Sequence, residues 1–80
     1  EITDTFGGEP NYGWVRRYLV RASSPVGAIR KVGRALGLRF RKVADYGDAV
    51  RYDSASGLTC AFVEIYGPDE GRAFDNAETL

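Results

Sequence analysis

The side chains of this chain that are best suited to chemistry are the basic ones, and they are concentrated in one segment. Ten of the 11 Lys and Arg residues lie between Trp14 and Arg51, together with only two of the 11 acidic residues. Ten cations and two acids give the segment 14–51 a charge of +8, and the remaining one cation and nine acids give −8. Nine of the cations are Arg, whose planar guanidinium group suits phosphate and carboxylate. This pattern predicts a surface that binds an anionic partner.

Groups that would support catalysis are missing from the sequence. There is no His, and the one Cys, Cys60, lies in an apolar segment where nothing activates it, so we expect a buried structural thiol. Glu64 has no second catalytic group in sight. The carboxylates of Asp45, Asp48 and Asp53 are explained by a hairpin turn, because the spacing of a calcium-binding loop is absent. We therefore expect no enzyme, no metal and no cofactor.

The elements that must position the cations follow from periodicity and turn residues. Ser24 and Pro25 predict the start of a helix and Gly37 its end. Strands are predicted over 2–6, 14–22, 38–45, 49–53 and 58–66. The resulting order, β-β-α-β-β-β, predicts an α+β fold in which one helix packs on one face of an antiparallel sheet of four to five strands.

Two basic surfaces follow from this arrangement. Strand alternation directs five arginines to the sheet face that the helix leaves open: Arg17, Arg21, Arg39, Arg41 and Arg51. The outer side of the helix carries a possible second basic surface, formed by Arg30, Lys31 and Arg34. Both sets are also compatible with a solvated surface whose long side chains merely cover apolar atoms.

The chain is predicted to form one α+β domain over residues 1–66, followed by an acidic, flexible tail over 67–80. The tail either keeps the protein soluble, or covers the basic face in the free protein, or mimics nucleic-acid phosphates towards a partner. The single Cys fits a reducing cytoplasm, and no apolar run is long enough for a membrane span. A cytoplasmic protein that uses neither a membrane nor a small-molecule substrate is expected.

Three segments also suggest a class of protein: 11–18 (NYGWVRRY), 28–32 (AIRKV) and 45–48 (DYGD). In size, layout and these segments the chain resembles small single-domain proteins of phages and mobile elements, among them anti-CRISPR inhibitors. The resemblance implies a stoichiometric inhibitor that docks on a CRISPR effector complex and blocks target-DNA binding or nuclease recruitment. It implies no catalytic residue.

The sequence thus leads to two main functional hypotheses, and a structural or adaptor module that pairs through exposed sheet edges is a third possibility. The first is a non-enzymatic inhibitor whose arginine-rich face docks on a host protein or nucleoprotein complex, with a CRISPR effector as the suspected target. The alternative is a small regulator that binds nucleic acid directly through the same basic face. The alternative predicts an affinity that falls steeply with salt.

Overall fold

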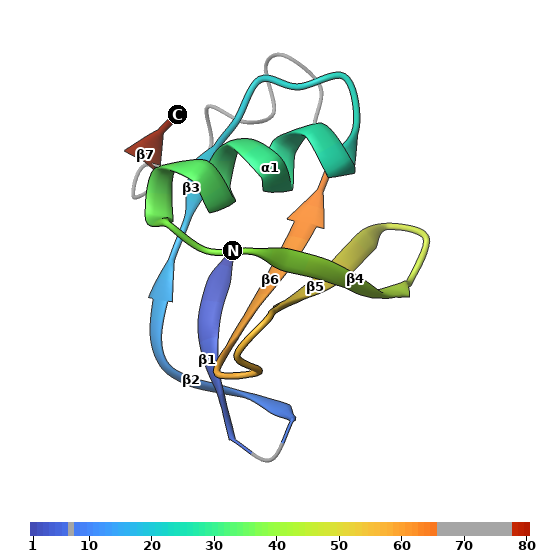
Figure 1. Ribbon diagram of the computed structural model, residues 1–80. Helices are drawn as coiled ribbons and strands as arrows, with labels where there is room; N and C mark the ends of the chain where they lie inside the picture. The colour runs from blue at the N-terminus through green and yellow to red at the C-terminus, as the bar shows by residue number, and fades with distance from the viewer. Residues whose placement is uncertain (7, 66–77) are drawn as a thin grey trace.

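The computed structural model describes residues 1–6, 8–65 and 78–80 and contains one helix and a five-stranded antiparallel sheet (Figure 1). The predicted α+β class and the single helix on one sheet face are confirmed. The sheet has the strand order β2-β1-β6-β5-β4. Along the chain the elements are β1 (Ile2–Phe6), β2 (Glu9–Arg16), β3 (Tyr18–Leu19), α1 (Pro25–Leu36), β4 (Phe40–Asp45), β5 (Ala49–Ser54), β6 (Thr59–Glu64) and β7 (Glu78–Thr79).

The helix α1 begins and ends where the sequence predicts. The Ser24 side chain accepts a hydrogen bond from the Gly27 amide at 3.1 Å, and Pro25 occupies the first turn. Gly37 ends the helix in the left-handed conformation, with φ 69°. Glycine tolerates this conformation because it has no Cβ.

The main core lies between α1 and the sheet. Its buried residues come from the helix and three strands, and they are Ile2, Ile29, Val32, Tyr52 and Ala61. Gly33 lets the helix approach the chain that leads into β4, because a Cβ at this position would lie 2.6 Å from the Leu38 carbonyl oxygen. This contact explains why a glycine is found in the middle of a helix.

The predicted strand over 14–22 is divided in the structure. Because Ile2, the first residue of β1, lies opposite Arg16, the chain beyond Arg16 has no partner in that strand. Tyr18 and Leu19 instead form β3, which pairs in parallel with β7 in a second, two-stranded sheet. Of the predicted acidic tail, residues 67–77 lie outside the described residues, and β7 belongs to the part that is described.

The sheet face away from α1 is closed at its centre. Thr3, Cys60 and Asp53 lie opposite one another on β1, β6 and β5. Thr3 and Cys60 are fully buried, so the thiol is buried as expected from the sequence. The expectation of a wholly open face is therefore corrected, because the centre of this face is buried. In the described part of the chain, no helix is long and apolar enough to cross a membrane.

Candidate anion-binding surface

The five arginines predicted to share one sheet face are found in different settings. Arg41 lies in β4 opposite Asp53, on the face away from α1. The pairing extends to Arg39, whose carbonyl accepts a hydrogen bond from the Ala55 amide at 2.9 Å. Alternation along the strand therefore places Arg39 on the same face as Arg41. Both side chains are exposed.

Arg17 and Arg21 lie away from this pair. Arg17 follows β2, which forms the sheet edge opposite to β4, and its Nε lies 3.3 Å from the Glu1 Oε2. Arg21 lies outside the sheet, in the connection between β3 and α1. The predicted set of five is thus divided among two sheet edges, a loop and the interior strand β5, which contains Arg51.

Arg51 is held by the fold. Its Nε donates to Asp53 Oδ1 at 2.9 Å and its Nη2 donates to the Gly8 carbonyl at 2.7 Å. The guanidinium carbon lies 6.0 Å from the centre of the Phe62 ring. The hydrogen bond with Asp53 is the main reason that the pKa of Arg51 is raised. With 12% of its side chain exposed, Arg51 has little surface to offer a partner.

The outer side of α1 carries cations in a different state. Arg30, Lys31 and Arg34 are all exposed, and none forms an ion pair with a described residue. The Lys31 ammonium group donates to the Arg21 carbonyl, which ties the helix to the segment that precedes it. Arg21 is exposed as well, so all four side chains present their charge to solvent.

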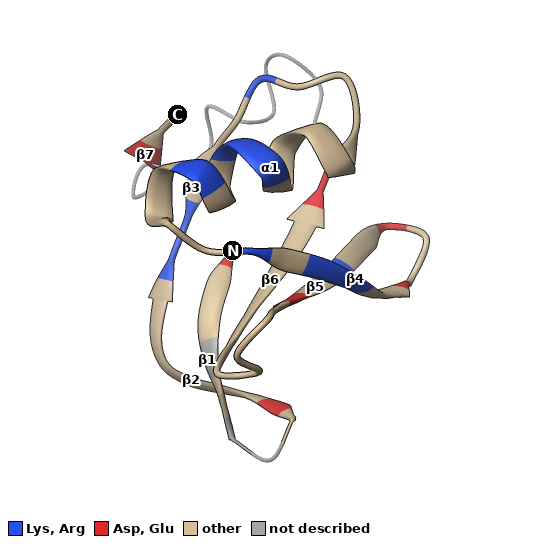
Figure 2. Ribbon diagram, viewed as in Figure 1, with Lys and Arg blue, Asp and Glu red and all other residues tan. Residues whose placement is uncertain are grey.

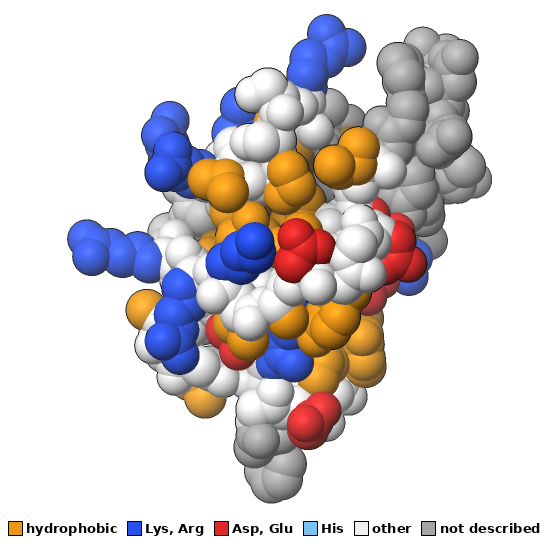
Figure 3. All heavy atoms as spheres, turned by 90° about the vertical axis from the view of Figure 1, so that its right-hand side faces the viewer, with side chains coloured by type: hydrophobic (Ala, Val, Ile, Leu, Met, Phe, Trp, Pro, Cys, Tyr) orange, Lys and Arg blue, Asp and Glu red, His pale blue; other side chains and the backbone are white. Residues whose placement is uncertain are grey.

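α1 packs against β4 and is joined to it by a short connection, so the exposed cations of the two elements border one edge of the molecule, with Arg39 and Arg41 on the sheet face away from α1. Figure 2 shows basic residues in part of α1 and in the first half of β4, and basic side chains project along one side of the molecule in Figure 3. We call this region the helix–β4 surface and define it by seven residues: Arg21, Arg30, Lys31, Arg34, Arg39, Arg41 and Lys42.

Two cations were missing from the sequence-based candidates. Lys42 belongs to the helix–β4 surface and makes a distant ion pair with Asp45, at 3.8 Å. Its neighbourhood contains a register shift between Lys42 and Ala44, so simple alternation does not describe this strand. Arg16 forms an ion pair with Glu78 at 3.0 Å, and no local sequence pattern indicates a partner so distant in the chain.

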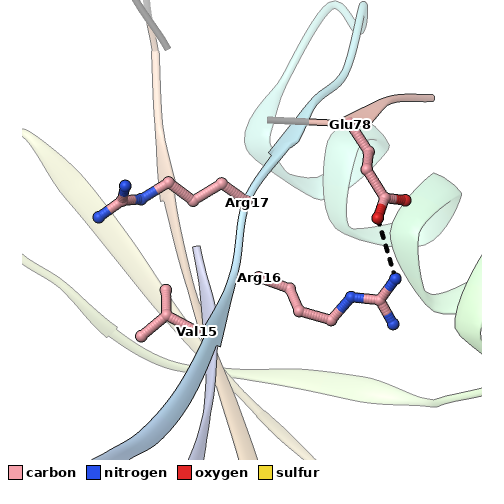
Figure 4. Close-up of a pocket in the computed structure, with 4 residues that line it drawn as sticks. All are labelled: Val15, Arg16, Arg17 and Glu78. Atoms are coloured by element: carbon pink, nitrogen blue, oxygen red, sulfur yellow. Dashed lines mark hydrogen bonds and ion pairs between the residues drawn. The ribbon is translucent and has the colours of Figure 1, made fainter. Parts of the chain in front are cut away.

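A shallow hollow of about 250 Å³ lies beside Arg16, lined also by Val15, Arg17 and Glu78 (Figure 4). Arg16 points toward Glu78, whereas Arg17 leaves the strand on the opposite side. The hollow therefore presents the Arg16–Glu78 ion pair rather than two converging guanidinium groups.

No group of three or more His, Cys, Asp and Glu residues that could hold a metal ion occurs in the segments the structure describes. Comparison with known proteins finds no matching family model, and no curated protein or solved structure is significantly similar to the chain.

Proposed function

We propose that this protein is a non-enzymatic binding protein that docks on nucleic acid through the helix–β4 surface. The observation that carries the proposal is the state of the cations on that surface. Six of the seven are exposed and have no carboxylate partner among the described residues; they are Arg21, Arg30, Lys31, Arg34, Arg39 and Arg41.

Unpaired cations of this kind favour a repeating anion. They are distributed over a helix, a loop and an edge strand, so a single carboxylate or phosphate could contact only a few of them. A phosphate backbone offers many charges at regular spacing, and each neutralised phosphate releases condensed counterions. Because backbone contacts carry no sequence information, we expect binding with little sequence preference.

The salt dependence of binding to a short DNA duplex, measured by fluorescence anisotropy, tests this function. The slope of log K against log salt is expected to be about −0.9 per phosphate contacted. The double variant Arg30→Gln/Arg34→Gln removes two exposed cations from α1, so the slope should become shallower by about 2.

Arg17→Gln is the matched control, because Arg17 lies at the opposite edge of the sheet and is paired with Glu1. This variant should leave the slope nearly unchanged. If Arg17→Gln made the salt slope equally shallow, the binding surface would have to be assigned to β2 instead. The absence of salt-dependent binding to any nucleic acid would reject the proposed function.

The second candidate is the inhibitor that docks on a CRISPR effector, and an observation at β4 favours it. β4 is an edge strand, and Val43, which follows Arg41 and Lys42 within it, is 49% exposed. A free strand edge can pair with a strand of a protein partner, while Arg39 and Arg41 would meet acidic side chains. The double variant Arg39→Glu/Arg41→Glu should then lose inhibition and keep its fold.

Affinity capture from a bacterial lysate that contains CRISPR effectors, with and without nuclease, separates the two candidates. Protein partners that remain after nuclease treatment support the inhibitor. Partners that disappear with nuclease support direct binding to nucleic acid. If the Arg39→Glu/Arg41→Glu variant still inhibited fully, the helix–β4 surface would not be the one through which the inhibitor docks.

A further inference from the structure

Strand β2 contains an outward bulge that carries two exposed aromatic residues. Thr3 lies opposite Val15, but Thr5 lies opposite Pro10, so residues 11–14 face a single position of β1. Tyr12 adopts φ 55°, in the left-handed region that L side chains disfavour. The Thr3 hydroxyl donates to the Trp14 carbonyl at 2.7 Å and so fixes the end of the bulge.

The bulge exposes large aromatic surface that the core does not use. Tyr12 is 53% exposed and Trp14 is 45% exposed. Trp is normally well buried, and an exposed indole in a fixed backbone is a feature of binding surfaces. Strained backbone also tends to occur at functional sites.

A cation lies next to this aromatic surface. Arg16 is two residues beyond Trp14 in the same strand, so their Cα atoms are roughly 7 Å apart. Its guanidinium carbon lies 5.5 Å from the centre of the Tyr18 ring. The Tyr18 hydroxyl is itself buried and has no hydrogen-bond partner in the described part of the chain.

In the structure, the carboxylate of Glu78 is already bound to the Arg16 guanidinium group. The Glu78 Oε1 accepts from Arg16 Nη2 at 3.0 Å, and this hydrogen bond raises the pKa of Arg16 (Figure 4). The carboxylate is supplied by β7, whose amide at Glu78 donates to the Arg17 carbonyl at 2.9 Å. Both charged side chains are more than half exposed, so the pair can exchange with solvent and with other anions.

We infer that Trp14 and Arg16 form a site for single-stranded nucleic acid that Glu78 occupies in the free protein. An unpaired base stacks on the Trp14 indole, and the adjacent phosphate replaces the Glu78 carboxylate on Arg16. The inference rests on the proposed function for the choice of ligand, but it concerns a different surface. The helix–β4 surface binds the sugar–phosphate backbone of the nucleic acid, and the β2 bulge distinguishes unpaired bases from paired ones.

Trp14 is the only Trp in the chain, so its intrinsic fluorescence reports on this site alone. Titration with oligothymidylate should quench the fluorescence saturably, whereas a duplex of equal length should not quench it. Trp14→Ala should weaken binding to oligothymidylate, measured by anisotropy, by about tenfold, and Trp14→Phe should retain most of the affinity. Tyr46→Ala is the matched control, because Tyr46 is 58% exposed in the β4–β5 turn.

Glu78→Gln should tighten binding to oligothymidylate about two- to fivefold, because the competing carboxylate is lost. Glu9→Gln is matched in charge, since it removes an exposed carboxylate from β2 itself. The control should therefore change affinity by much less. Arg16→Gln should weaken binding and should also abolish the gain from Glu78→Gln, as expected for two residues that interact directly.

The outcomes separate this site from the proposed function. Salt-dependent duplex binding without Trp14 quenching by oligothymidylate would overturn the β2 site and leave the helix–β4 surface standing. Quenching that Arg30→Gln/Arg34→Gln leaves intact would support the β2 site alone. Equal effects of Glu78→Gln and Glu9→Gln would overturn the role of Glu78. Capture of a protein that quenches Trp14, without any effect of oligothymidylate, would replace the nucleic-acid ligand by a protein partner.

Discussion

Arg51 and Arg41 lie on neighbouring strands, and their environments could hardly differ more. Arg51 is 12% exposed and donates to both Asp53 and the Gly8 carbonyl. Arg41 lies opposite the same Asp53 in the register of β4 and β5, but it is exposed and forms no ion pair with any described residue. Residue type does not distinguish a structural arginine from one that is available for binding. The neighbouring acceptors do, and Asp53 is already satisfied by Arg51.

The largest effect should come from removing the structural arginine. Arg51→Met leaves Asp53 and the Gly8 carbonyl without their donor, which should lower the free energy of unfolding by about 2–3 kcal/mol. That is most of the stability expected for a domain of this size. Urea denaturation followed by circular dichroism measures the loss.

Arg41→Met is the matched control and should change the free energy of unfolding by less than about 0.5 kcal/mol. The double variant Arg51→Met/Asp53→Leu should regain much of the lost stability, because the unpaired carboxylate is gone. If Arg51→Met and Arg41→Met lowered the free energy of unfolding equally, Arg51 would not be a structural arginine in contrast to Arg41.

The next effect concerns the contact that joins α1 to β4. Gly33→Ala places a Cβ 2.6 Å from the Leu38 carbonyl oxygen, so backbone must move. We expect a loss of about 1–3 kcal/mol in the free energy of unfolding despite the better helix propensity of Ala.

Gly27→Ala is the control within the same helix. Its Cβ would make ordinary contacts of 3.4 Å and 3.6 Å, so this variant should be neutral or more stable by up to about 1 kcal/mol. A stabilised Gly33→Ala protein would show that the close approach of α1 to β4 is not required.

A smaller effect is expected at the start of the helix that carries the free cations. Ser24→Ala removes the acceptor for the Gly27 amide and should cost about 1 kcal/mol in thermal or urea unfolding. Ser23→Ala, at the exposed neighbouring position, should cost far less. If the two variants lost equal stability, the cap would not be what fixes the start of α1.

The smallest effect on the free energy of unfolding is expected for the unpaired cations of α1, and it is an increase rather than a loss. Arg30 and Arg34 are four residues apart on one helix, so their like charges repel. Arg30→Gln should therefore raise the free energy of unfolding at low salt by about 0.2–0.5 kcal/mol while it weakens binding to nucleic acid. A variant that lost both stability and binding would indicate a structural role for Arg30, like that of Arg51.

The sequence by itself determined the limits of α1, the two faces of β5 and the distribution of charge along the chain. The limits of α1 follow from Ser24 and Gly37, because capping and the left-handed φ are properties of single residues. The two faces of β5 follow from the alternation of Val50 and Tyr52 with Arg51. The segregation of charge into the segment 14–51 needed no structure either.

Only the tertiary structure decided which cations are free. Arg51 is held by Gly8, a residue 43 positions away, and Arg16 is held by Glu78, 62 positions away. The bulge in β2 and the pairing of β3 with β7 also depend on register between distant segments. Local periodicity fixes the face on which a side chain lies, but it carries no information about the distant group that meets it there. The candidate surface was therefore only partly predictable, because exposure and pairing are set by contacts between segments far apart in the chain.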